Sequence, residues 1–137
     1  MGRSFFKMIF IALFSFLIAE IPAEIDSEVT RAIQGYEKLI EKFPEIEDLK
    51  YNLGNIYANT GNLDLAKKEF QRALSTDDNE LKAYSLYNMG NIEFQRGNYE
   101  ESMNLYREAL KILPDDKDIL HNYIISQKIL KDSQGQE

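Results

Sequence analysis

The sequence predicts an all-α fold, a solenoid of helix-turn-helix units with about six helices after a hydrophobic N-terminal segment. The first observation is a repeated stretch: Y-N-L-G-N-I at residues 51–56 returns as Y-N-M-G-N-I at residues 87–92, 36 residues later. The second is that Gly-Asn follows both copies at the same distance, at residues 61–62 and 97–98. A period of this length is typical of stacked helical repeats, so no strands are expected.

The N-terminal segment, residues 1–23, is the first element. Two basic residues precede an almost wholly apolar run from Met8 to Ala19. A basic start, a short apolar run and a small-residue exit describe a secretory signal peptide, cleaved after Ala19 or Ala23. One alternative is an uncleaved membrane anchor, although a spanning helix needs about 20 apolar residues. The other is a buried helix of the soluble fold.

Residues 24–131 form the predicted repeat domain. Pro44 lies 70 residues before Pro114, which is the length of one unit of 34 residues plus one of 36. The two prolines therefore occupy the same position in their units. The register therefore predicts a half repeat at 24–46, whose helix at 27–43 is the second helix of a unit. The first helix of that unit would fall on the hydrophobic segment.

Two full repeats and a cap complete the predicted domain. Repeat 1 covers residues 47–82 and repeat 2 covers residues 83–116. Residues 117–131 form an amphipathic capping helix with Asp115 or Asp116 as its N-cap. Stacked repeats need such a solvated end. Residues 132–137 are a polar tail.

Within both repeats, small and aromatic residues recur at fixed places. They are Gly54, Ala66, Phe70 and Ala73 in repeat 1, and Gly90, Ser102, Tyr106 and Ala109 in repeat 2. This pattern resembles the tetratricopeptide repeat, which reads L-G-x-x-Y, then A-x-x-x-F, then A and P. The resemblance implies small residues where two helices cross closely and aromatic residues that fill the gap to the next unit. Gly61 and Gly97 would end helices in a left-handed conformation.

Composition excludes several classes of function. The 137 residues are 44 % apolar and 28 % charged, which fits a folded domain, and the net charge of −7 argues against nucleic acid binding. The absence of cysteine removes disulfides, thiolate metal sites and a cysteine nucleophile. The one histidine, His121, has no second metal-binding partner nearby. We therefore expect no enzyme, cofactor or metal site.

The resemblance implies a concave face lined by the first helix of each unit. The predicted partner-binding residues are Tyr51, Asn52, Asn55, Asn59, Tyr84, Tyr87, Asn88, Asn91, Phe94, His121 and Asn122. Asparagine both donates to and accepts from a peptide backbone, and tyrosine adds a flat apolar contact. The predicted ligand is an extended peptide or a short helix of another protein. The alternatives are that this motif is only the common sequence of such helices, or that the surface serves self-association.

The half repeat leaves a predicted open edge. Its edge contact would be Ile25, Val29 and Ile33, while Ala32, Tyr36, Leu39 and Ile40 would face repeat 1. A protein partner or a second copy of the chain would cover the edge, or the edge would be solvated.

The resulting prediction is a non-catalytic protein-binding module, exported across a membrane or tethered to it. Residues from about Tyr84 to Lys131 resemble small bacterial repeat proteins of the Bacteroides-aerotolerance group, which implies a periplasmic or periplasm-facing location. The alternatives are a structural accessory subunit of a larger membrane complex and a cytosolic repeat protein.

Overall fold

Six α-helices follow one another in residues 22–135, the part of the chain that the computed structural model describes. They are α2 (Pro22–Lys42), α3 (Glu47–Asn59), α4 (Leu63–Ala73), α5 (Asn79–Gln95), α6 (Tyr99–Ile112) and α7 (Lys117–Gln134). No strand occurs within these residues, so the predicted all-α class is confirmed. The predicted signal peptide or anchor lies outside the described residues except for its last two, which begin α2.

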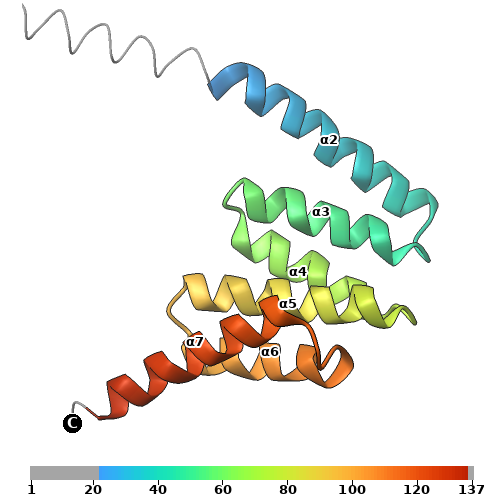
Figure 1. Cartoon of the computed structure of the whole chain (residues 1–137). Coiled ribbons are helices and arrows are strands. Elements are labelled where there is room, and N and C mark those ends of the chain that lie inside the picture. Colours follow the sequence, from blue (N-terminus) through green and yellow to red (C-terminus); the bar gives the residue numbers. More distant parts are fainter. Residues whose placement is uncertain (1–21, 136–137) are drawn as a thin grey trace, which may run out of the picture. The chain divides into compact units, whose positions relative to one another are not determined.

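The chain divides into two compact units, residues 1–35 and residues 36–137, and the division falls inside α2. In the second unit each helix from α3 to α6 packs on the next one along the chain (Figure 1). The α3–α4 and α5–α6 pairs are the two predicted helix-turn-helix repeats, and α7 packs on α6. Packing mainly between sequence neighbours is the defining property of a solenoid.

Glycine closes the first helix of each pair in the predicted left-handed conformation. The φ angle is +79° at Gly61 and +80° at Gly97. The next residue, Asn62, donates its backbone N–H to Tyr57 O at 2.8 Å, and Asn98 makes the equivalent bond at 2.9 Å. These bonds satisfy carbonyls that a helix end leaves open, and glycine adopts the required φ without strain.

Two further glycines allow the helices of each pair to approach closely. A Cβ atom added to Gly54 would lie 2.8 Å from Phe70 Cδ1, and one added to Gly90 would lie 2.6 Å from Tyr106 Cε1. Because real Cβ contacts are longer, only glycine fits beneath each ring. The predicted close crossing is confirmed. Each aromatic ring packs on the glycine of its own pair. Tyr106 also forms a buried cluster with Ile119 of α7, as predicted for a residue that fills the gap to the next unit.

Aspartate side chains begin two of the helices. Asp78 accepts hydrogen bonds from the second and third backbone N–H groups of α5 at 2.8 and 3.0 Å. Asp116 does the same for α7 at 3.0 Å, so Asp116 and not Asp115 is the N-cap. The cap at Asp78 lets α5 begin at Asn79, four residues before the predicted start of repeat 2.

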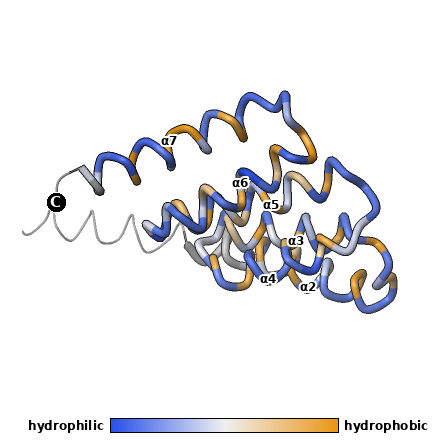
Figure 2. The backbone as a smooth tube through the Cα atoms, turned by 90° about the horizontal axis from the view of Figure 1, so that it is seen from below, coloured by the Kyte–Doolittle hydropathy of each residue, from blue (hydrophilic) through white to orange (hydrophobic). Residues whose placement is uncertain are grey.

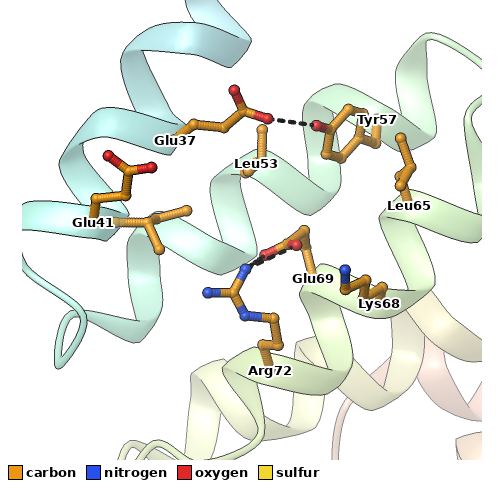
Figure 3. A pocket seen from close by; sticks show the side chains of 9 residues that line it. Glu37, Glu41, Leu53, Tyr57, Leu65, Lys68, Glu69 and Arg72 are labelled. Carbon is orange, nitrogen blue, oxygen red and sulfur yellow. Dashed lines mark hydrogen bonds and ion pairs between the residues drawn. The ribbon is translucent and has the colours of Figure 1, made fainter.

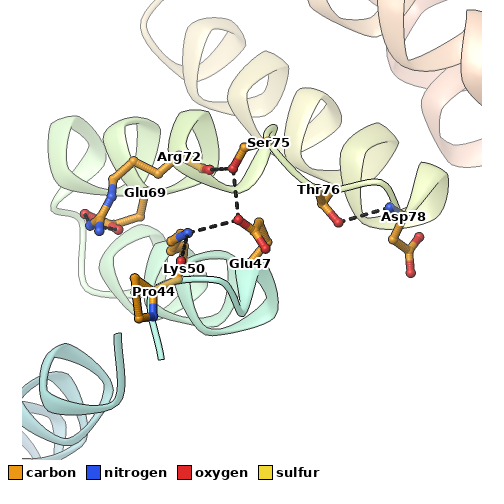
Figure 4. Close-up of polar contacts among 8 residues, drawn as sticks. All are labelled: Pro44, Glu47, Lys50, Glu69, Arg72, Ser75, Thr76 and Asp78. Carbon is orange, nitrogen blue, oxygen red and sulfur yellow. Dashed lines mark hydrogen bonds and ion pairs between the residues drawn. The ribbon is translucent and has the colours of Figure 1, made fainter. Parts of the chain in front are cut away.

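Lys50 ties the start of α3 to its surroundings, although lysine is an unusual residue to bury. Its exposed fraction is 7 %. Lys50 Nζ donates to Pro44 O at 2.6 Å and to Glu47 Oε1 at 3.1 Å (Figure 4). Ser75 Oγ, just beyond α4, donates to the same Glu47 oxygen at 3.0 Å. The hydrogen bond from Lys50 lowers the pKa of Glu47, so this link stays charged at neutral pH.

The faces of α2 differ from the prediction. Val29 and Ile33 share one stripe with Tyr36 and Ile40, because residues spaced by three and four lie on one side of a helix. Ile40 is only 6 % exposed, whereas Leu39 beside it is 43 % exposed. The prediction that Leu39 and Ile40 share one face, opposite to Val29 and Ile33, is therefore wrong.

The other two residues of the half repeat follow the same correction. Ala32 is exposed together with Leu39 and does not share the buried side of Ile40. The side chain of Ile25, the third predicted edge residue, lies outside the description.

Candidate functional site

Asparagine and tyrosine side chains join the first helices of successive pairs. On α5, Asn88 Nδ2 donates to Tyr51 Oη and to Asn55 Oδ1 of α3, both at 3.2 Å. On α7, Asn122 Nδ2 donates to Tyr87 Oη at 3.1 Å and to Asn91 Oδ1 at 3.0 Å of α5. The same polar step therefore occurs twice. We call it the asparagine ladder: Tyr51, Asn55, Asn88, Tyr87, Asn91 and Asn122.

The ladder uses only part of its hydrogen-bonding capacity. An amide nitrogen carries two protons, so Asn88 and Asn122 each donate both of theirs within the ladder. The amide nitrogens of Asn55 and Asn91 and the side-chain oxygen of Asn88 make no hydrogen bond to any described residue. Three polar atoms of the ladder thus remain available for a ligand.

A hollow of about 230 Å³ opens beside the ladder, between α3, α4 and α5. Amide side chains line one part of it and apolar side chains the rest: Asn55, Asn59, Asn88, Asn91 and Gln95, then Ala58, Leu63, Phe70 and Ile92. We call it the asparagine hollow. The structure thus brings together four of the predicted groove residues around one cavity.

The apolar floor of this hollow was not among the predicted site residues. Leu63 and Phe70 come from α4 and Ile92 from the buried side of α5. The repeat register marks Phe70 as a core residue, and its ring is fully buried beneath the hollow, so Ala58 and Leu63 supply the accessible apolar surface there. The position of Leu63 directly after the Gly-Asn turn was the one sequence feature that could have pointed to its place in the hollow.

The two groove tyrosines of the ladder also stabilise the fold. The ring of Tyr51 lies 5.6 Å from that of Phe70, and the ring of Tyr87 lies 5.7 Å from that of Tyr106, both tilted. Burial raises the pKa of Tyr106, whose hydroxyl donates to Asn91 Oδ1 at 2.7 Å. Tyr51 and Tyr87 are consequently held in place by neighbours from their own helix pairs.

The remaining predicted residues lie outside the asparagine hollow. Tyr84 Oη donates to Asp116 Oδ2 at 3.2 Å, and this bond to a carboxylate raises the pKa of Tyr84. The Phe94 ring meets Tyr99 edge-on at 5.2 Å. Asn52 and His121 are exposed. The structure therefore does not gather all the predicted groove residues into one site.

A larger hollow of about 500 Å³ lies between the C-terminal turns of α2 and helices α3 and α4 (Figure 3). It contains none of the predicted groove residues. Arg72 Nη1 donates to Glu69 Oε2 at 2.7 Å, and Tyr57 Oη donates to Glu37 at 3.3 Å. Burial and then the Glu37 charge raise the pKa of Tyr57. Because these groups pair with one another, the asparagine hollow is the better candidate for a binding site.

Two negative findings apply to residues 22–135. No group of three or more histidine, aspartate or glutamate side chains is placed to hold a metal ion there. None of the six described helices is both long and apolar enough to cross a membrane.

The fold and the hollow define a helical repeat protein whose first helices line a polar surface. Residues 45–115 match the sequence model of the tetratricopeptide repeat family. The match covers more than half of the chain, so the protein belongs to the tetratricopeptide repeat family. Repeats of this family generally bind other proteins and are not catalytic, and protein–protein interaction is the function that membership establishes.

Individual relatives are more distant. The chain is similar to Tetratricopeptide repeat protein 21A of Homo sapiens, with 28 % identity over 99 residues, 72 % of this chain and 7 % of that protein. It is similar to Uncharacterized protein ycf37 of Cyanophora paradoxa, with 34 % identity over 115 residues, 81 % of this chain and 64 % of that protein. The chain thus spans less than two thirds of either relative.

Among solved structures, the chain resembles the crystal structure of the Sgt2 TPR domain from Aspergillus fumigatus. The TM-score is 0.67 at 14 % identity, over 82 % of this chain and 74 % of that one. At this identity the likeness concerns the fold alone, and it agrees with the stacked helix pairs described above.

Proposed function

We propose that this chain is a non-catalytic adaptor that binds an extended peptide or a short helix of a partner protein at the asparagine hollow. The observation that supports it is the pairing of unsatisfied amide groups with an apolar floor in one cavity. Amide groups recognise a peptide backbone irrespective of its sequence, whereas an apolar floor accepts one side chain. Together they suit a segment of chain better than a small charged metabolite.

The hollow can be tested with residues that have no structural partner. Asn59 and Gln95 line it, are exposed and make no hydrogen bond to the described residues. We expect the double variant Asn59→Ala/Gln95→Ala to bind the partner more than tenfold more weakly. Two lost hydrogen bonds remove about 2 kcal/mol, and about 1.4 kcal/mol is a factor of ten.

The measurement is quantitative recovery of partner proteins by tagged full-length chain from the cells that produce it. Glu108→Ala, on the exposed side of α6, is the matched control and should recover partners like the wild type. Unchanged recovery by the double variant, with an unchanged melting temperature, would place partner binding elsewhere.

We further propose that residues 1–23 export the chain across a membrane or tether it to one. The basic start and the apolar run of this segment support the proposal. In a bacterium of the Bacteroides-aerotolerance type the module would then face the periplasm. N-terminal sequencing separates the two forms: a start at Glu20 or Glu24 indicates a released module, and a retained Met1 in the membrane fraction indicates a tethered one. A retained Met1 in the soluble fraction would contradict both.

A further inference from the structure

One asparagine in the register of the asparagine ladder has no partner. Each first helix carries an asparagine at the same place: Asn52 on α3, Asn88 on α5 and Asn122 on α7. Asn88 and Asn122 are half-buried, and each donates both amide protons to the preceding first helix. Asn52 is exposed and makes no hydrogen bond to any described residue. The ladder is therefore open at α3.

The apolar residues around Asn52 are also less covered than their equivalents. In α5 and α7 the residues three before and four after the asparagine are at most 3 % exposed. They are Ser85 and Ile92 in α5, and Ile119 and Ser126 in α7. The matching residues of α3, Leu49 and Ile56, are only half-buried. We call Leu49, Asn52 and Ile56 the open ladder face: an unpaired amide with an apolar side chain one turn before it and another one turn after it.

We propose that the open ladder face binds a helix of another protein, one that carries a tyrosine and, four residues later, an asparagine. The fold itself shows this recognition twice. Asn88 Nδ2 donates to Tyr51 Oη and Asn55 Oδ1, both at 3.2 Å, and the step from α7 to α5 repeats the arrangement. Residues four apart lie on one side of a helix, so one partner helix presents both acceptors. The amide nitrogen of Asn52 supplies the two protons that they need.

The chain itself does not offer such a helix. Residues 1–21, which precede α2, contain no tyrosine and no asparagine. In a second copy, the tyrosine–asparagine pairs of α3 and α5 already accept hydrogen bonds within that copy. Apolar residues recur along α7 (Figure 2), where His121 and Ile125 stand at the places of Tyr87 and Asn91. The missing acceptors must therefore come from a different protein.

A synthetic helix with the sequence of residues 47–59 is a defined probe for this surface. It carries Tyr51 and Asn55 in the arrangement that receives Asn88 in the fold. Helices this short are marginal in water, so a hydrocarbon staple replaces Leu49 and Leu53. The staple lies on the other side of the helix from Tyr51 and Asn55 and leaves both acceptors accessible.

The probe is titrated into the full-length, ¹⁵N-labelled chain, and the side-chain amide signals are followed by nuclear magnetic resonance. We expect the signals of Asn52 to shift and to saturate, while those of Asn104 on α6 stay in place. A matched probe with Tyr51→Phe and Asn55→Ala should bind at least tenfold more weakly, because it lacks both acceptors.

A variant of the chain tests the same contact from the other side. Asn52→Ala should weaken binding of the first probe at least tenfold, as measured from neighbouring backbone signals. Its melting temperature should equal that of the wild type, because Asn52 has no partner in the fold. Asn88→Ala is the contrasting variant, since it loses two hydrogen bonds of the ladder and should melt at a lower temperature.

Three results would overturn the proposal. One is the absence of a shift at Asn52, as expected if a segment of the same chain fills the place, or equal affinity for the two probes. Another is a shift at Asn52 when unlabelled chain is added, which would assign the face to a second copy. The third is a shift at Gln95 in place of Asn52. Gln95 lines the asparagine hollow and Asn52 does not, so that result would support the hollow and the two proposals fail separately.

Discussion

Replacing Tyr106 with alanine is expected to lower the free energy of unfolding by about 3–5 kcal/mol, the usual cost of removing a buried aromatic side chain. Tyr106 is 1 % exposed and fills the space above Gly90. Its ring also packs with Ile119 and Tyr123 of α7, so one side chain holds three helices together. The loss is a large part of the 5–15 kcal/mol that stabilises an ordinary domain.

Urea unfolding followed by far-ultraviolet circular dichroism measures this effect. Tyr106→Phe is the matched control, because it keeps the ring and loses only the hydrogen bond to Asn91. We expect it to lose about 1 kcal/mol. Because α7 depends on this ring, the alanine variant should also lose helical content at lower urea concentration. An alanine variant as stable as the phenylalanine variant would contradict the packing described here.

Replacing Glu93 with alanine is expected to lower the free energy of unfolding by about 2–3 kcal/mol. Glu93 is 3 % exposed and accepts hydrogen bonds from Lys67 at 2.7 Å and from Asn98 at 2.6 Å. Lys67 lies on α4, so this ion pair joins the two repeats. Removing one partner of a buried pair costs about 3–5 kcal/mol. The cost is smaller here because the Lys67 side chain is 31 % exposed and can be partly solvated.

The same carboxylate should make stability depend on pH. Burial alone would raise the pKa of Glu93, but the hydrogen bonds from Asn98 and Lys67 outweigh it and lower the pKa. The folded chain therefore keeps the charge to lower pH than the unfolded chain does. Glu93 stabilises the fold above the unfolded glutamate pKa of about 4.3, and this contribution is lost as the pH falls through the lowered folded value.

The control for this effect is Glu93→Gln, which retains the shape and removes the charge. The wild type should be more stable than Glu93→Gln at neutral pH, and the difference in melting temperature should shrink in acid. A difference that stays constant from neutral pH into acid would show that the charge of Glu93 contributes nothing.

The elements fixed by local sterics could be predicted from the sequence. Gly61 and Gly97 recur before asparagine, and only a left-handed turn requires glycine there. Gly54 and Gly90 recur at one place in each unit, and each lies beneath the aromatic ring that the register names. These features depend only on a residue and its own helix pair. Two copies of the pattern in one chain were therefore sufficient to predict them.

Features that depend on how helices meet could not be predicted. The groove asparagines were expected to face a ligand, but the crossing of α3, α5 and α7 brings several of them together as the asparagine ladder. The face of α2 that packs on repeat 1 was assigned by motif position, which placed Leu39 on that face and Val29 on the other. In the structure Leu39 is exposed, and Val29 lies on the same stripe as the buried Ile40. The role of Glu93 could not be predicted from the sequence, because its partners come from another repeat (Lys67) and from the following turn (Asn98).

The central claim, that the asparagine hollow binds a segment of a partner protein, is tested most directly by photo-crosslinking. Tyr87 is an unsuitable position for the probe, since its ring packs on Tyr106. A photoreactive amino acid at Asn59 lines the hollow and replaces an exposed side chain. The same probe at Glu108 reports chance encounters on α6. A discrete crosslinked protein from Asn59 that is absent from Glu108 is the predicted result. Identical crosslinking from both positions, or none from Asn59, would contradict the claim.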